Sequence, residues 1–267
     1  MNLRRVFAVV LRQFYLMRGS LSRVLPLFAW VMVDMALWGF LTRYLDSVSA
    51  AGFGVAASML GCVLLWDFFM RVMQGVTMAF FEDVWSRNFL NYFASPLTIW
   101  EYLAGLVVSS VATSAAGLVG MLLLAGLGFG LSFAVYGALF APFLAVLFAF
   151  GIALGIMATA MVLRLGPASE WLVWPIPALI APFAGVFYPV SILPAWMRAV
   201  SRLLPPSYVF EAMRALAAGA RVPAHALPVA AVLCAAYLAL AAWIFALTYR
   251  RVVRDGLIAR YSAETVS

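Results

Sequence analysis

The chain has 267 residues, about 67% of them hydrophobic and only 10% charged, with a mean hydropathy of +1.06. Soluble domains contain about 45–50% apolar and about 25% charged residues, so this composition excludes a soluble enzyme. It also excludes a disordered chain, which lacks apolar residues. The long unbroken apolar runs differ from the alternating segments of a membrane β-barrel. We therefore expect an all-α polytopic membrane protein.

The few charged and reactive residues exclude several kinds of chemistry. All seventeen basic residues are arginine, so a phosphate loop, which needs Gly-Lys-Ser/Thr, and a lysine Schiff base are both excluded. The net charge of +7 does not indicate nucleic-acid binding, because the arginines lie between apolar segments. Cys62, Cys234 and the single His225 are too few and too scattered for a metal site. We expect no metal, cofactor or catalytic site in this chain.

The first 23 residues are typical of an interfacial segment. Leu3, Phe7, Val10, Phe14 and Met17 recur every three or four residues and predict an amphipathic helix over 3–18. Its arginines lie off this apolar stripe, as in helices that lie in the plane of a membrane surface. Arg12 and Gln13 interrupt the apolar stretch, which argues against a signal peptide.

Six spans are predicted to follow within a single transmembrane domain of 1–267. Each is close to or above the roughly 20 residues that cross a 30 Å hydrocarbon core. The fifth contains Pro175, Pro177 and Pro182 and is expected to be broken. The predicted spans are 24–42, 53–81, 102–128, 133–163, 171–188 and 227–249, and residues 250–267 form a tail.

The arginines orient these spans. Eleven lie on the side of the N-terminus and five on the other side, with Arg71 inside a span. The positive-inside rule therefore predicts that both termini face the cytoplasm. The inner eleven are Arg4, Arg5, Arg12, Arg18, Arg23, Arg87, Arg164, Arg250, Arg251, Arg254 and Arg260.

Two connections depart from a plain helix bundle. The cytoplasmic stretch 82–101 is expected to start a short helix at Glu82 and Asp83 and to expose apolar side chains; it is either an interfacial anchor or a docking surface for a partner. The outer stretch 189–223 predicts two short helices, 195–204 and 208–218, half-inserted in the outer leaflet, or else an ordinary amphipathic loop. The side chains expected at the cytoplasmic surface are Val84, Trp85, Phe89 and Tyr92.

Three ionisable residues lie inside predicted spans, where charge is costly. Counting about 1.5 Å per residue from the inner ends, Asp34 lies about 15 Å deep and Arg71 about 14 Å deep. We expect them to form a neutral pair between two helices, with Asp67 as a competing partner of Arg71. A proton relay is the less favoured alternative.

Small and aromatic residues add two weaker signals. Gly151 and Gly155 form a small-residue pattern that permits close helix packing in lipid. Several aromatic residues either line a substrate path or pack in the structure and against lipid, and packing is favoured for each one taken singly. They are Trp66, Phe68, Phe69, Phe183, Phe187 and Tyr188.

The layout resembles the membrane permease subunit of type-2 ATP-binding-cassette exporters over nearly the whole chain. The N-terminal amphipathic helix fits, and 91–103 (NYFASPLTIWEYL) is similar to the segment after that family's coupling helix. The most specific tracts are 187–196 (FYPVSILPAW) and 204–214 (LPPSYVFEAMR), which are similar to the family's region before its last span. The chain differs from large sterol exporters in having no ATPase domain and only short outer loops.

The resemblance implies a set of partners and a mechanism. Two permease chains would pair in a bacterial plasma membrane, and each would bind a cytoplasmic ATPase subunit that carries ATP and Mg²⁺. Movement of a coupling helix near 82–91 would open a path for an amphipathic, lipid-linked, polysaccharide or drug-type substrate. The resemblance does not indicate which substrate is moved, whether the two chains are identical, or whether an outer accessory protein takes part.

Two other classes of function were weighed against this one. A proton-coupled secondary transporter would use Asp34 and Asp67 as carriers, and inverted repeats would favour it, but the two halves show no convincing similarity. An intramembrane enzyme would need clustered His, Asp or Glu at one depth. Co-purification with an ATPase subunit distinguishes among the three.

Overall fold

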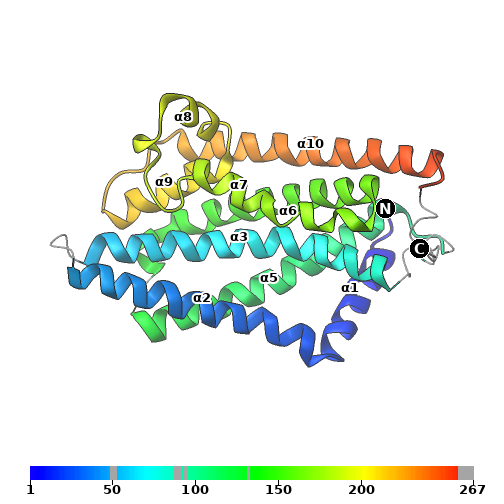
Figure 1. Ribbon diagram of the computed structural model, residues 1–267, viewed down its shortest axis with the longest axis horizontal. Helices are drawn as coiled ribbons and strands as arrows, with labels where there is room; N and C mark the ends of the chain where they lie inside the picture. The colour runs from blue at the N-terminus through cyan, green and yellow to red at the C-terminus, as the bar shows by residue number, and fades with distance from the viewer. Residues whose placement is uncertain (49–52, 87–91, 93–94, 131–132, 258–267) are drawn as a thin grey trace.

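The protein is a bundle of long helices in the computed structural model, which describes residues 1–48, 53–86, 92, 95–130 and 133–257. All regular secondary structure in these ranges is helical, as predicted. The long helices lie along a common axis (Figure 1), with α3 in contact with α2, α5 and α6, and α6 in contact with α10. They are α2 (Leu21–Val48), α3 (Phe53–Trp85), α5 (Ile99–Phe129), α6 (Phe140–Leu165) and α10 (Ala226–Arg254).

Among the described residues, four helical segments are long and apolar enough to cross a membrane. They have 25 to 31 residues each, more than the roughly 20 that a bilayer requires. They contain most of the second, third, fourth and sixth predicted spans, and their ends extend one to five residues beyond five of the predicted boundaries. The segments are Gly61–Trp85, Ile99–Gly128, Val135–Leu165 and Ala226–Arg254.

The two other predicted spans are not among these four segments. The first, 24–42, lies within α2, which is 28 residues long. The fifth, 171–188, is not one helix: it is divided into a 3₁₀ helix, η2 (Pro167–Leu172), and the ten-residue helix α7 (Pro175–Ala184). Ten residues rise only about 15 Å, half of the hydrocarbon core. Pro175 accounts for the start of α7, because a proline lacks the backbone N–H that would continue a helix from the preceding turn.

Helix α1 (Leu3–Arg18) lies at a steep angle to the long helices at one end of the bundle (Figure 1). Leu3, Phe7 and Phe14 of the predicted stripe point outwards, with more than half of their surface exposed. A second face, with Val6 and Val9, is buried. Helix α1 contacts α5, so it has one exposed apolar face and another that packs against the protein.

Two glycines of α6 allow it to pack closely on α3. A Cβ atom added at Gly151 would lie 3.0 Å from Val72 Cβ, and one at Gly155 would lie 2.8 Å from the Met73 carbonyl oxygen. Neither position has room for a side chain without a shift of the partner helix. The predicted close-packing role of this small-residue pattern is confirmed.

The end of the bundle opposite α1 carries the predicted short helices, α8 (Ala195–Ser201) and α9 (Pro205–Ala217), beside the end of α7 (Figure 1). Arg214 of α9 donates to the carbonyl oxygens of Gly185 and Val186, and Glu211 accepts from the Val190 N–H at 2.8 Å. An apolar face of α9 is buried, whereas Trp196 on α8 is 64% exposed. These contacts hold the turn after α7 against α9.

The close approach of α3 and α6 makes Gly155→Ala informative. The added methyl group would meet the Met73 carbonyl, so we expect a loss of about 1–3 kcal/mol in unfolding free energy. Denaturant titration of the purified protein in detergent measures it. Gly128→Ala is the matched control, because nothing lies within 4 Å of the added atom and alanine favours the helix. Equal stability of the two variants would contradict the packing role.

Candidate functional site

The end of α3 carries a buried carboxylate that ties three helices together. Asp83 has no exposed surface, and its Oδ1 lies 2.6 Å from Nη1 of Arg12 in α1. The hydroxyl of Tyr102 in α5 donates to Asp83 Oδ2 at 2.7 Å, and that of Tyr92 donates to Oδ1 at 3.1 Å. We call these four residues the Asp83 clasp.

The clasp keeps the Tyr92 hydroxyl protonated. The Arg12 guanidinium lies 5.1 Å from the centre of the Tyr92 ring, a cation–π distance. Burial, together with the negative charge of Asp83, raises the pKa of Tyr92 above its ordinary value. The Tyr92 phenol therefore stays protonated at neutral pH and remains a hydrogen-bond donor to the carboxylate.

A second set of polar contacts fixes α1 to the start of α5. Thr98 and Glu101 form a capping box, in which each side chain accepts from the backbone N–H of the other. Glu101 also accepts from the Asn2 backbone N–H at 2.6 Å and lies 3.4 Å from Arg5. The Thr-x-x-Glu pattern is a recognisable helix start, so the sequence contains a signal for these contacts.

The clasp corrects the expected surface at 82–91. Helix α3 continues to Trp85, so Asp83 lies in its last turn rather than at a helix start. Val84 is also buried, at 5% exposure, because α1 and α5 cover this end of α3. Trp85 is 54% exposed, Glu82 and Tyr92 are half-buried, and Phe89 lies outside the described residues.

A second candidate site is a cavity of about 350 Å³ beside α3. It brings together the three intramembrane charges predicted to interact: Asp34 comes from α2, and Asp67 and Arg71 lie one turn apart on α3. The full lining is Asp34, Asp67, Met70, Arg71, Gln74 and Trp174. We call this the charged cavity.

The charged cavity holds two carboxylates and one guanidinium that act on one another electrostatically. Oδ2 of Asp67 is buried and has no hydrogen-bond partner in the described part of the chain. The grouping agrees with the predicted Asp34–Arg71 proximity and keeps Asp67 as the competing partner. A cavity with two acidic groups, an amide and an indole can bind a cationic or hydroxyl-rich group, or exchange a proton.

The aromatic residues proposed for a substrate path separate into two groups. Trp66, Phe68 and Phe69 are buried in the core, and Phe69 stacks on Phe150 with 5.6 Å between ring centres. Phe187, by contrast, stacks on Trp38 of α2 with 5.6 Å between ring centres. Phe183 meets Trp196 at 6.1 Å, and the Tyr188 hydroxyl donates to the Pro182 carbonyl. Packing therefore accounts for Trp66, Phe68 and Phe69 within one chain.

No protein-family model matches this sequence, and no curated protein does either. Within the described ranges, no three His, Cys, Asp or Glu residues gather closely enough to hold a metal ion. Cys62 and Cys234 are both buried as free thiols. What this chain does is therefore argued from the clasp, the charged cavity and the arrangement of its helices.

The Asp83 clasp predicts a strong effect of Arg12→Gln. Removing the cation leaves a carboxylate without exposed surface uncompensated, which costs about 3–5 kcal/mol. Adding Asp83→Asn removes that charge, so the double variant should recover part of the loss in denaturant titration. Arg254→Gln is the control, because its pair with Asp255 is exposed and is worth at most about 1 kcal/mol. Additive losses in the double variant would exclude a stabilising pair.

The charged cavity predicts a different double-variant result. Arg71→Gln leaves two carboxylates around one cavity, so neutralising a carboxylate as well should be milder than Arg71→Gln alone. Arg71→Gln is therefore combined with Asp34→Asn and, separately, with Asp67→Asn, and unfolding is measured in detergent. The combination that recovers more stability identifies the main partner of Arg71. Gln74→Leu, which changes no charge, controls for cavity shape, and recovery in neither combination would exclude the pairing.

Proposed function

We propose that this chain is the permease subunit of an ATP-driven exporter of the type-2 ATP-binding-cassette kind. The order of its helices carries the proposal: α1 lies across the inner end, the fifth predicted span is divided into η2 and α7, α8 and α9 are short and lie at the opposite end, and α10 is long. The two tracts most similar to that family, 187–196 and 204–214, lie in this last region. The match rests on this layout and on those residues.

The proposed topology has six passes in a bacterial inner membrane, with the α1 end in the cytoplasm. Helix α2 would supply one pass in addition to the four long apolar segments, and η2 with α7 would supply the other as a broken crossing. Helices α8 and α9 would lie at the outer leaflet without crossing. Arg5, Arg12 and Arg18 of α1 and Arg251 and Arg254 of α10 are at the same end of the bundle, which supports the positive-inside orientation.

The proposed coupling surface is the end of α3 and the segment after it. Trp85 is exposed at the tip of an otherwise buried helix end, and buried aromatic anchors carry much of the energy of protein interfaces. Glu82, Phe89 and Tyr92 are the further residues of this surface. Asp83 and Val84 would act from inside, because a force on Trp85 reaches α1 and α5 through the Asp83 clasp.

The substrate would be amphipathic, lipid-linked, polysaccharide or drug-like, and would move between two permease copies. ATP and Mg²⁺ would be held by the cytoplasmic ATPase subunit, and this chain would not itself be an enzyme. Phe183, Phe187 and Tyr188 remain proposed path residues, because they are only half-buried in one chain. The buried Trp66 and Phe69 would join a path only if the helices moved apart.

A proton-coupled transporter is the second candidate, and one observation favours it. Asp67 Oδ2 is buried without a hydrogen-bond partner in the described ranges, beside a cavity shared with Asp34. A carboxyl group in such a place can take up and release a proton. Uptake driven by a pH gradient in vesicles without an ATPase, and abolished by Asp67→Asn, would select this alternative.

The proposed coupling surface predicts that Trp85→Ala leaves the permease folded and inserted but weakens its binding to the ATPase subunit. Loss of an anchor worth 2 kcal/mol or more reduces affinity about thirtyfold. The measurement is recovery of the ATPase subunit with the tagged permease, together with substrate-stimulated ATP hydrolysis in vesicles. Trp196→Ala, an equally exposed tryptophan at the opposite end, is the control. Full recovery of the ATPase subunit and full transport with Trp85→Ala would contradict the coupling role and indicate that the segment is a lipid anchor.

A further inference from the structure

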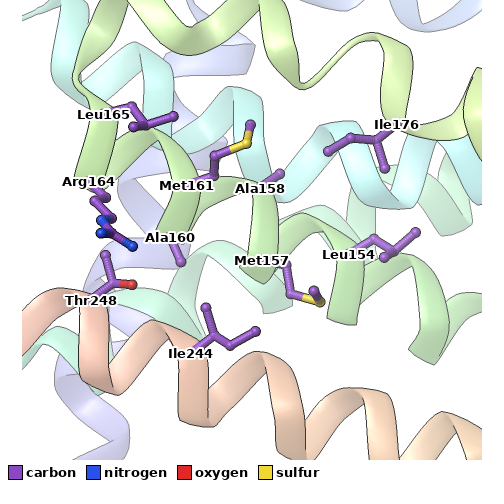
Figure 2. A pocket seen from close by; sticks show the side chains of 10 residues that line it. All are labelled: Leu154, Met157, Ala158, Ala160, Met161, Arg164, Leu165, Ile176, Ile244 and Thr248. Atoms are coloured by element: carbon purple, nitrogen blue, oxygen red, sulfur yellow. The ribbon is translucent and has the colours of Figure 1, made fainter.

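Another cavity lies between α6, α7 and α10. Its volume is about 450 Å³, within the roughly 300–1,000 Å³ of small-ligand sites. Figure 2 shows its side chains, which are apolar except for Arg164 and Thr248. They are Leu154, Met157, Ala158, Ala160, Met161, Arg164, Leu165, Ile176, Ile244 and Thr248.

The length of this groove matches one leaflet of a bilayer. Leu154 and Arg164 lie ten residues apart on α6, which is a rise of about 15 Å. That is half of a hydrocarbon core of about 30 Å. The groove is therefore as long as an acyl chain that reaches from the headgroup region to the bilayer centre, and Met157 and Met161 give it an adaptable wall.

The charged end of the groove is suited to an anionic headgroup. Arg164 is exposed in the last turn of α6, and no ion pair or hydrogen bond to another described residue is formed by its guanidinium. In Figure 2 its side chain points towards α10 and Thr248. Arg251 follows Ile244 and Thr248 at helical spacing, so it lies on the same face of α10, one turn further out.

We propose that this groove binds an anionic phospholipid of the leaflet at the α1 end, with one acyl chain along α6 and the phosphate between Arg164 and Arg251. Basic pockets between membrane helices on the cytoplasmic side are suited to anionic headgroups. The apolar wall recognises the chain, and the two guanidinium groups distinguish a negative headgroup from a zwitterionic one. This inference requires only that α6 and α10 cross the membrane, and it is independent of the proposed transport activity.

The test is a titration of the full-length protein, purified in detergent, with fluorescent phosphatidylglycerol and with the matching phosphatidylcholine. We expect phosphatidylglycerol to bind more tightly, and Arg164→Gln to weaken its binding about fivefold while leaving phosphatidylcholine unchanged. Arg198→Gln, an exposed arginine on α8 at the opposite end, should leave both lipids unchanged. Glycerol phosphate, which has no acyl chain, should not compete.

A groove-filling variant keeps the result interpretable. Ile176→Trp places a large side chain in the groove without changing its charge, and it should reduce phosphatidylglycerol binding while the thermal unfolding midpoint stays near that of the wild type. If that variant unfolds, Met161→Trp serves the same purpose from α6. Equal binding of the two lipids, or wild-type binding by Arg164→Gln, would overturn the proposal. Disulfide cross-linking between two Met161→Cys chains gives a further test. If its yield stays the same in excess phosphatidylglycerol, a second copy of the chain occupies the groove and the proposal is overturned.

Discussion

The ion pair between Asp83 and Arg12 is the constraint on which the α1 end of the molecule depends. Asp83 has no exposed surface and lies in the last turn of α3, where the helix dipole disfavours a negative charge. An unpaired carboxylate there would be strongly destabilising. The carboxylate therefore requires a cation, and Arg12 supplies it only when α1 lies against α5 and the end of α3. The position of α1 and the burial of Asp83 therefore depend on each other through this ion pair.

The rest of the bundle divides between tight packing and polar space. Helices α3 and α6 approach closely because Gly151 and Gly155 of α6 have no side chains to hold them away from Val72 and Met73 of α3. The charged cavity lies beside the same helix, between Asp34 of α2 and Trp174 before α7. Helix α3 thus contributes to the Asp83 clasp, to the close contact with α6 and to the charged cavity. A displacement of the Trp85 end of α3 would act on all three features. The proposed coupling at Trp85 requires such an effect.

The candidate sites were only partly predictable from the sequence. The cost of charge in a membrane singled out Asp34, Asp67 and Arg71, and the structure places them around one cavity. The importance of Arg12 was missed, because an arginine off the apolar stripe of an interfacial helix has no sequence feature that distinguishes a headgroup contact from a buried partner. Trp66 and Phe69 also could not be assigned, since an aromatic residue in a span packs equally well against lipid, substrate or protein.

The sequence by itself determined the class of the protein, the long apolar helices, the interfacial helix at 3–18 and the two short helices before α10. It did so because a bilayer imposes length and hydropathy on each segment separately, without reference to its neighbours. Only the tertiary structure decided that α3 runs on to Trp85, that Val84 is buried, and that an apolar groove ends at Arg164. These features depend on which helices meet. Such contacts join residues far apart in the chain, and no local pattern records them.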